Sequence, residues 1–387
     1  MSWARELVSS KSGRRLSLRQ QPPTTGDELP WLVAYDLDEN KGSVLKSRLT
    51  ARAWSLWRYE ELLPMENFTG RIDLGEGGTP LVRVRNMPYD MEVWLKEEAG
   101  NPTGSFKDRG LSLAVNRAKE LGAPGVQLPS AGNAALATAA YAAAGGLPCR
   151  VALPSDTPSV IVDRCRSYGA EVLRGGATLV DSASALAAFD DGFWDLSTFR
   201  EPYRVEGKKT MGLELVEQFD WHPPDWIFYP TGGGTGIVAM YKAFQELQVL
   251  GLLDERLPRL VAVQMEGCAP LVRAFHAGEK RADVWQEPDT RVWGLRVPRS
   301  LADSLILEAL RSTNGSAVSA AEDQLEEIRA RYARQEGRWL GPEGAAAVAG
   351  FEELRDEGLV RAGERVLIFQ TGHPANYFEQ RGAGHRS

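Results

Sequence analysis

Apolar positions recur with two different spacings, and the two alternate from about residue 90 onward. In one kind of segment, apolar residues stand three or four apart, as on one face of a helix. Leu111, Ala114 and Val115 have this spacing, and Gly122 is placed to end that helix. The other kind is a short apolar run between turn-forming residues, which is typical of a strand. The pattern predicts helices at 105–121, 133–144, 159–168 and 236–250, and strands at 91–98, 125–130, 149–154, 170–175, 226–230, 259–264 and 364–370. Such alternation indicates βαβ units, so we expect an α/β protein with mostly parallel sheets.

Residues 1–65 follow a different pattern and are predicted to be an N-terminal extension. Polar runs at 9–15 and 20–30 precede a tryptophan-rich segment at 51–64. We expect this region to form a hairpin and a helix that dock on the main body.

Composition excludes several classes of protein. The chain has 387 residues and is 43% hydrophobic, which is sufficient for one large or two coupled α/β domains. Charged residues make up 25% of it and the net charge is -7, which gives no indication of nucleic acid or a membrane surface as partner. No window has the roughly 18 to 20 apolar residues of a spanning helix, and the first ten residues lack a cleavable apolar stretch. We therefore expect a cytoplasmic protein.

Cysteine and histidine positions do not suggest a disulfide framework or a metal site. The three cysteines, Cys149, Cys165 and Cys268, are scattered and form no CxxC pair. The four histidines include no two at ligand spacing and no HExxH motif. We expect no metal centre.

Candidate chemistry lies in the loops that follow strands, because parallel sheets bind ligands at the carboxyl ends of their strands. The loop 101–110 places Lys107 in the first turn of a helix, where the positive helix end disfavours a charged amine. Partial burial behind Phe106 would lower the pKa of this amine further. An amine that loses its proton near neutral pH is a Schiff-base nucleophile. The alternative for Lys107 alone is a solvated lysine at a helix start.

The loop 130–135 also connects a strand to a helix. Backbone N–H groups at a helix N-terminus bind anions, so this loop can seat the carboxylate of an amino acid. Asn133 can also donate to a phenolic oxygen. The alternative is an ordinary helix cap, because Ser130 and Asn133 are favoured there.

The loop 230–236 contains three consecutive glycines, Gly232, Gly233 and Gly234. Glycines let the backbone approach a ligand, and their N–H groups can form a phosphate cup at the start of the next helix. No lysine follows as in a P-loop. A dinucleotide site remains an alternative, because Glu266 follows the next strand.

Thr371 follows the last predicted strand, where its hydroxyl can face the nitrogen of a pyridine ring. The alternative is a turn that ends the strand. Taken together, the four loops offer a nucleophilic amine, a carboxylate seat, a phosphate seat and a neutral partner for a ring nitrogen. These are the attachment points of pyridoxal 5′-phosphate (PLP) with an amino acid.

The sequence resembles the threonine synthase family of PLP-dependent enzymes, which have the tryptophan synthase β type of fold (fold type II). The motifs that carry the resemblance are LGEGGTPL at 74–81, NPTGSFKDRG at 101–110, SAGNAA at 130–135, EPYRVEGKKTMG at 201–212, PTGGGTG at 230–236, GLRVP at 294–298, GPEGAA at 341–346 and TGH at 371–373. The resemblance implies two α/β domains with the cofactor in the cleft between them, and a homodimer. The implied boundaries are 66–110 with 205–387 for the large PLP-binding domain and 111–204 for the small one.

The resemblance also implies roles for the residues of the cofactor site. Lys107 joins the cofactor as a Schiff base and moves protons, and Phe106 shapes the pocket. Asn133 contacts the cofactor's 3′ oxygen, and Thr371 faces the pyridine nitrogen. The residues implied to hold the phosphate are Gly232, Gly233, Gly234, Thr235 and Gly236.

For the substrate, the residues implied to hold the carboxylate are Ser130, Ala131 and Ala134. Those implied to face its far end are Ser197, Thr198, Arg204 and Lys208. Arg204 is the best candidate to bind a substrate phosphate, through bidentate hydrogen bonds. Its alternative is a surface or interdomain salt bridge.

The sequence departs from the family pattern at two places. Pro374, Ala375 and Asn376 follow the TGH motif in place of glycine, leucine and lysine, and Val292 and Trp293 replace small residues. The expected reaction is that of a lyase which converts O-phosphohomoserine and water to threonine and phosphate. One alternative is β-elimination or β-replacement on another small amino acid. The other is a PLP-fold protein that binds without catalysis.

Overall fold

Three β-sheets organise the part of the chain that the structure, a computed structural model, describes: residues 1–130, 132–176 and 179–377. Along the largest described sheet the strands are β12 (Ser316–Ala320), β11 (Arg259–Met265), β10 (Trp226–Pro230), β13 (Arg365–Gln370), β5 (Glu92–Glu97) and β4 (Leu81–Arg83). Neighbouring strands in it are parallel except for the pair β4 and β5. The second sheet is parallel, with the strands β8 (Glu171–Arg174), β7 (Cys149–Leu153), β6 (Val126–Pro129) and β9 (Trp194–Asp195). The predicted α/β class with mostly parallel sheets is therefore confirmed.

Helices cover both faces of the largest sheet. One face carries α6 (Tyr203–Gln218), α7 (Thr235–Val249), α8 (Pro270–His276) and α9 (Asp303–Ser312), and the other carries α10 (Asp323–Glu336) and α11 (Pro342–Asp356). Along β10, Ile227 and Tyr229 pack into the first of these cores, while Trp226 and Phe228 pack into the second. Both faces are buried, so the strand is an unbroken apolar run instead of an alternating one.

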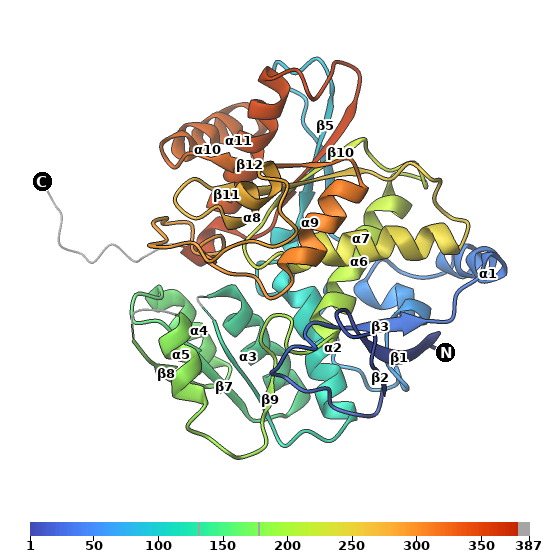
Figure 1. Ribbon diagram of the computed structural model, residues 1–387, viewed down its shortest axis with the longest axis vertical. Coiled ribbons are helices and arrows are strands. Elements are labelled where there is room, and N and C mark those ends of the chain that lie inside the picture. Colours follow the sequence, from blue (N-terminus) through green and yellow to red (C-terminus); the bar gives the residue numbers. More distant parts are fainter. Residues whose placement is uncertain (131, 177–178, 378–387) are drawn as a thin grey trace, which may run out of the picture.

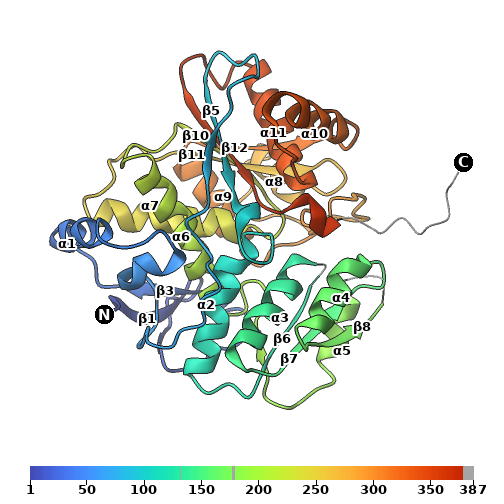
Figure 2. The same ribbon diagram turned by 180° about the vertical axis from the view of Figure 1, so that it is seen from behind.

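The smaller parallel sheet forms a second lobe with its own core, below the first in Figure 1 and seen from behind in Figure 2. Its helices are α2 (Lys107–Glu120), α3 (Asn133–Gly145), α4 (Ser159–Ser167) and α5 (Leu179–Leu186). The alanine-rich α3 is almost wholly buried between α2 and the strands β6 and β7. Small side chains allow this close approach on every face of the helix. Where the domain boundaries fall along the chain stays a prediction.

Helices α2 and α6 cross where the two lobes meet, and two glycines permit that crossing. A Cβ at Gly207 would lie 2.0 Å from the Arg109 carbonyl oxygen, and a Cβ at Gly110 would lie 2.8 Å from the Arg204 carbonyl oxygen. The backbones therefore touch, which places the N-terminal turn of α2 directly beside the N-terminal turn of α6.

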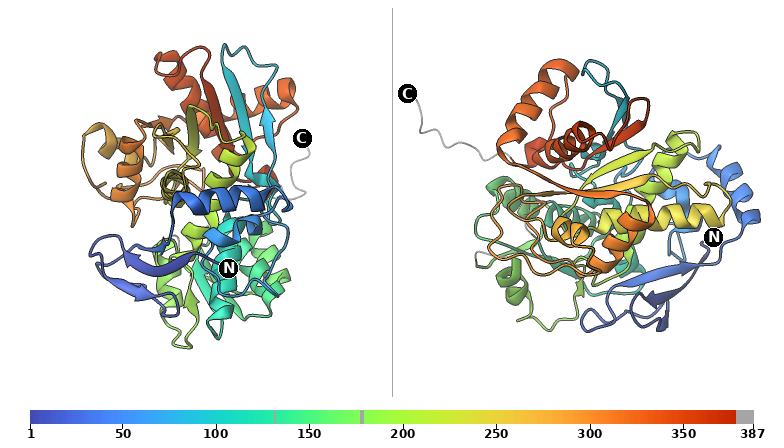
Figure 3. Two further views of the ribbon diagram at one scale, coloured as in Figure 1. Left: turned by 90° about the vertical axis from the view of Figure 1, so that its right-hand side faces the viewer. Right: turned by 45° about the horizontal axis from the view of Figure 1, so that its top comes forward.

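The N-terminal region docks on the side of this assembly (Figure 3). It contains the antiparallel strands β2 (Arg15–Ser17), β1 (Ala4–Ser9) and β3 (Trp31–Tyr35), then α1 (Glu39–Leu49) and the 3-10 helix η1 (Leu56–Leu62). The Tyr35 hydroxyl donates to the carboxylate of Glu206 in α6 at 2.7 Å. The predicted hairpin and docking helix are confirmed. Within the described residues, no helix is both long and apolar enough to cross a bilayer.

The sequence pattern placed the elements of the βαβ units well but assigned no helix at α6. The reason is that every residue from Tyr203 to Val216 is buried, charged ones included, so α6 has no polar face to reveal its period. The sequence pattern also predicts no elements in the segment 270–356, which contains α8, α9, β12, α10 and α11.

Candidate active site

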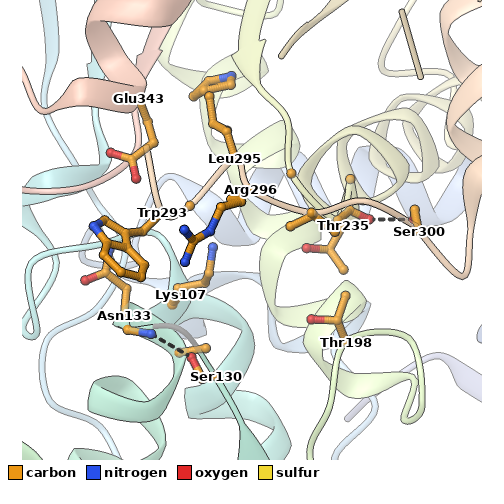
Figure 4. A pocket seen from close by; sticks show the side chains of 18 of the residues that line it. Lys107, Ser130, Asn133, Thr198, Thr235, Trp293, Leu295, Arg296, Ser300 and Glu343 are labelled. Atoms are coloured by element: carbon orange, nitrogen blue, oxygen red, sulfur yellow. Dashed lines mark hydrogen bonds between the residues drawn. The ribbon is translucent and has the colours of Figure 1, made fainter. Parts of the chain in front are cut away.

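A cavity of about 750 Å³ lies between the largest sheet and the smaller parallel sheet, and the carboxyl ends of β6, β10 and β13 open into it. Its wall includes Lys107, Asn133, Thr235 and Glu343, which converge from four different helices (Figure 4). The predicted loops thus meet at one place although they are far apart in the sequence.

Lys107 is the first residue of α2 and partly lines this cavity. Burial, followed by the nearby Arg204 guanidinium, lowers the pKa of the Lys107 amine to about 7, against a smaller opposing effect of Glu343. Its Nζ lies 3.7 Å from the centre of the Phe106 ring. The Phe106 backbone N–H donates to the Thr371 carbonyl oxygen at 3.0 Å, so the lysine loop is fixed to the end of β13. Lys107 thus lies on the cavity wall, and its role as the Schiff-base lysine stays a prediction.

Two positions of the loop between β10 and α7 require glycine. A Cβ at Gly232 would lie 2.3 Å from the Gly294 carbonyl oxygen. Gly234 has φ 78°, and a Cβ there would lie 2.0 Å from Ile306 Cδ1. At the start of α7, the Thr235 hydroxyl accepts a hydrogen bond of 2.6 Å from Lys208 Nζ. Bare backbone at a helix N-terminus, with a buried amine beside it, fits the phosphate of PLP.

The loop after β6 turns into α3 around the Ser130 side chain. Ser130 Oγ accepts from the backbone N–H groups of Gly132 at 3.1 Å and Ala135 at 3.2 Å. Ala134 and Asn133 complete this wall of the cavity, and Ala131 lies outside the described residues.

Two buried basic side chains beside Lys107 have only neutral hydrogen-bond partners among the described side chains and carbonyls. Arg204 Nη1 donates to the Leu196 carbonyl oxygen at 2.7 Å, and its buried Nε has no partner there. Lys208 donates to the Thr235 hydroxyl. Burial, then Arg204 and Lys107, lower the pKa of Lys208 well below its ordinary value. Among the described residues Arg204 forms no salt bridge, and its role in binding a phosphate stays a prediction.

Glu201 acts electrostatically on both Arg204 and Lys208, but its hydrogen bonds within the described residues go to the backbone of α6. Burial raises the pKa of Glu201 to about 7, although Arg204 acts in the opposite direction. The Glu201 carboxylate accepts from the backbone N–H groups of Tyr203 at 2.6 Å and of Arg204 at 3.1 Å, so it caps α6. The guanidinium of Arg204 thus keeps hydrogen-bonding capacity for a ligand.

The remaining predicted residues divide into two groups. Thr198, Thr371 and Gly236 lie on the cavity wall. Ser197 instead turns its hydroxyl to the Asp195 carboxylate, which also accepts the Ser197 backbone N–H at 2.8 Å. Ser197 thus closes the turn after β9.

Several wall residues were not predicted as site residues. Glu343 lies near the start of α11, and its Oε1 accepts from the Tyr377 hydroxyl at 2.8 Å. Arg296 stacks over the Trp293 ring at 4.4 Å from its centre. The GPEGAA motif was a signal for Glu343, because glycine and proline before an acid mark a helix start. Tyr377 directly follows Pro374, Ala375 and Asn376, where the sequence departs from the family pattern. Across the described residues, no group of three or more histidine, cysteine or acidic side chains could hold a metal ion.

Comparisons with known proteins agree with this geometry. The family "Pyridoxal-phosphate dependent enzyme" matches residues 72–372. The threonine synthase of Methanocaldococcus jannaschii is 33% identical over 347 residues, which are 88% of this chain and 85% of that protein. The threonine synthase of Methanosarcina acetivorans is also 33% identical, over 88% of this chain and 84% of its own. The chain belongs to the family of PLP-dependent enzymes.

Solved structures show the same fold. A fungal L-serine ammonia-lyase from Rhizomucor miehei matches with a TM-score of 0.66 and 20% identity, covering 76% of this chain and 93% of that one. The processed form of threonine deaminase isoform 2 from Solanum lycopersicum matches with a TM-score of 0.64 and 20% identity, covering 91% and 92%. The fold is therefore fold type II, and the protein is a threonine synthase-like PLP-dependent lyase with pyridoxal 5′-phosphate as its cofactor. This confirms the predicted cofactor and excludes the dinucleotide and non-catalytic alternatives.

Proposed function

We propose that this enzyme converts O-phosphohomoserine and water to threonine and phosphate. The observation that carries the proposal is geometric: Lys107 and Arg204 line one cavity and Lys208 lies beside its glycine loop. Among the described residues, Arg204 and Lys208 donate only to neutral acceptors. One anion, the cofactor phosphate, would occupy the glycine loop beside Lys208. The Arg204 guanidinium then remains for a second phosphate, which the substrate would supply.

The cofactor would be held by the residues whose geometry fits it. The glycine loop and Thr235 would bind its phosphate, Asn133 its ring oxygen, and Thr371 would face its ring nitrogen. When bound, PLP spreads the negative charge that develops as a substrate C–H bond breaks. Phe106 excludes water from one side of Lys107, since their contact is close.

Lys107 is the proposed proton carrier. With a pKa near 7, its amine can accept a proton from the substrate α-carbon and later return one to the product. Ser130 shapes the loop at the start of α3, whose N–H groups would seat the substrate carboxylate. With the carboxylate there and the phosphate at Arg204 and Thr198, the substrate would span the cavity past Lys107. A second proton leaves the β-carbon, and phosphate leaves from the γ-carbon, which takes up a proton to become the methyl group. Water then supplies the hydroxyl group at the β-carbon, a proton returns to the α-carbon, and the remaining proton of water goes to the phosphate.

The test is phosphate release from O-phosphohomoserine by the purified holoenzyme, with threonine measured in the same samples. We expect equal amounts of the two products. Borohydride reduction followed by peptide mapping should place a pyridoxyl group on Lys107. Turnover without phosphate release, or a pyridoxyl group on another lysine, contradicts the proposal.

A second candidate is β-elimination from a smaller amino acid such as serine or threonine. It is favoured by Trp293, whose bulk lies on the cavity wall with Arg296 stacked on it. Release of ammonia and a keto acid from serine or threonine, faster than phosphate from O-phosphohomoserine, would establish it. Replacement of the substrate's β-substituent by an added thiol would instead indicate β-replacement.

We also propose a cytoplasmic homodimer. The three cysteines are buried free thiols, which suits a reducing compartment. Cell fractionation tests the location, and light scattering of the purified holoenzyme should give about twice the mass of one 42.5 kDa chain.

A further inference from the structure

The segment after the TGH motif departs from the family pattern, and it reaches the cavity as the 3-10 helix η3 (Pro374–Tyr377). We infer that this segment completes a hydrogen-bond relay of fixed direction that holds Asn133 as a donor toward the cofactor. Its members, in order, are Arg164, Asn376, Asn133, Tyr377 and Glu343. The inference deepens the proposed function, because it concerns the same site and rests on PLP binding there.

The relay starts at a group that can only donate. Arg164, in α4 of the smaller lobe, donates from Nη1 to Asn376 Oδ1 at 2.7 Å. This contact fixes the Asn376 amide with its Nδ2 toward three acceptors. Nδ2 donates to Asn133 Oδ1 at 2.9 Å and shares its other hydrogen between the carbonyl oxygens of Thr103 at 3.2 Å and Gly104 at 3.4 Å. Asn376 is buried, so water does not offer its amide an alternative orientation.

The same direction continues through the cavity wall. Because Asn133 Oδ1 already accepts, Asn133 must present its Nδ2 to the other side, where it donates to the Tyr377 hydroxyl at 2.8 Å. The Tyr377 hydroxyl has a single hydrogen, and it donates this to Glu343 Oε1 at 2.8 Å. Glu343 Oε2 is buried and has no hydrogen-bond partner among the described residues.

The fixed direction has a chemical consequence. An asparagine amide has two donor hydrogens, and one of those on Asn133 is used by Tyr377. The other is left for the cavity, where it suits an acceptor such as a ring oxygen carrying negative charge. A rotated amide would present its carbonyl oxygen there and repel that charge. Tyr377 therefore acts as a positioning residue, since it works through Asn133 and Glu343.

The first test is Tyr377→Phe, which keeps the ring and removes the hydroxyl. We expect PLP to bind the apoprotein about tenfold more weakly, because one hydrogen bond is lost. The pH midpoint of the holoenzyme's visible absorption change, measured without substrate, should shift by about one unit. The matched control is Tyr89→Phe, which removes a tyrosine hydroxyl bonded to Glu352 at a site outside the cavity. The control should change neither quantity.

The second test is Asn376→Asp, which keeps the shape but replaces the donor with an acceptor. Asn133 would have to rotate to donate to the new carboxylate, which reverses the relay. We expect weaker PLP binding than in Tyr377→Phe, with the absorption midpoint again shifted. Thermal unfolding of both apoproteins separates this from misfolding, since each should stay folded at the assay temperature.

The outcomes separate the relay from the proposed reaction. Wild-type PLP affinity and absorption in either folded variant, or equal shifts in Tyr89→Phe, would overturn the relay. If one variant does not fold, the other decides. Failure of the wild-type enzyme to release phosphate from O-phosphohomoserine would overturn the proposed substrate, while the relay would still be judged by cofactor affinity and absorption.

Discussion

Two clusters of buried charge lie where α2 crosses α6, and they differ in whether their charges are balanced. The balanced cluster consists of Arg109, Lys96, Glu98 and Glu214. The cationic cluster consists of Lys107, Arg204 and Lys208. Only one residue separates Lys107 from Arg109 along α2, so two nearby positions of one helix belong to clusters that differ in charge balance.

In the balanced cluster every charge faces an opposite charge. Arg109 donates to Glu98 at 2.7 Å through both Nε and Nη2, and to Glu214 at 2.9 Å and 3.0 Å. Burial alone would raise the pKa of Glu214, but Arg109 and Lys96 hold it below its ordinary value. A network so completely paired tolerates burial and leaves nothing for a ligand.

In the cationic cluster, by contrast, burial serves function and not stability. The pKa values of Lys107, Lys208 and Arg204 are all lowered, first by burial. Unpaired buried charge costs free energy, and a protein retains it where an anion or a proton transfer requires it. The comparison teaches that incomplete pairing, more than burial or charge, marks the ligand site.

The largest expected effect comes from Lys107→Met. Turnover should fall by about 10³-fold or more, because the proton carrier is lost. The apoprotein should be no less stable than wild type, since the variant removes a basic group whose pKa is lowered, first by burial. Steady-state kinetics and urea unfolding measure the two quantities. The control is Lys119→Met, on the exposed side of the same helix, which should leave turnover unchanged. A clear loss of apoprotein stability in Lys107→Met would contradict the distinction between the clusters.

Arg109→Met should have the reverse effect on stability. It leaves Glu98 and Glu214 buried without their partner, which we expect to lower the free energy of unfolding by about 3–5 kcal/mol. The exposed pair of Arg291 and Glu322 provides the control, where Arg291→Met should cost about 0–1 kcal/mol. Urea unfolding of the apoproteins compares them. If both variants lose a similar amount of unfolding free energy, the balanced cluster contributes no more to stability than the exposed pair does.

Arg204→Met tests whether the cationic cluster binds the substrate's phosphate. We expect the KM for O-phosphohomoserine to rise by about 10- to 100-fold, because a charge-assisted hydrogen bond is lost. PLP affinity should change by less than about threefold, since the glycine loop and Lys208 are intact. If PLP affinity falls as much as substrate affinity, Arg204 serves the cofactor instead.

The sequence predicted those parts of this comparison that depend on local chemistry. Lys107 at a helix start and the glycines of the loop 230–236 are recognisable, because steric and dipole rules act within a few residues. The pairing state of a charge depends on residues far away in the chain. The sequence near Arg109 does not indicate that Glu214 is its partner, and the sequence near Asn133 does not indicate Tyr377. Helix α6 was missed for a related reason, since several of its buried charges, such as Glu214 and Lys209, have partners on other elements.

The smallest expected effect is a pH dependence of apoprotein stability that belongs to Lys107. Its pKa is about 7 in the folded protein and, unperturbed, about 10.4 in the unfolded chain. Between these values the unfolded state binds more protons, so the free energy of unfolding rises with pH. Between pH 7 and pH 9.5, the free energy of unfolding of wild type should therefore rise by about 1–2 kcal/mol more than that of Lys107→Met. This figure allows for the partial exposure of the amine. Taking the difference between the two proteins removes groups that titrate alike in both. Urea unfolding at a series of pH values measures it, and a constant difference would show that Lys107 is fully charged in the fold, like the paired Arg109.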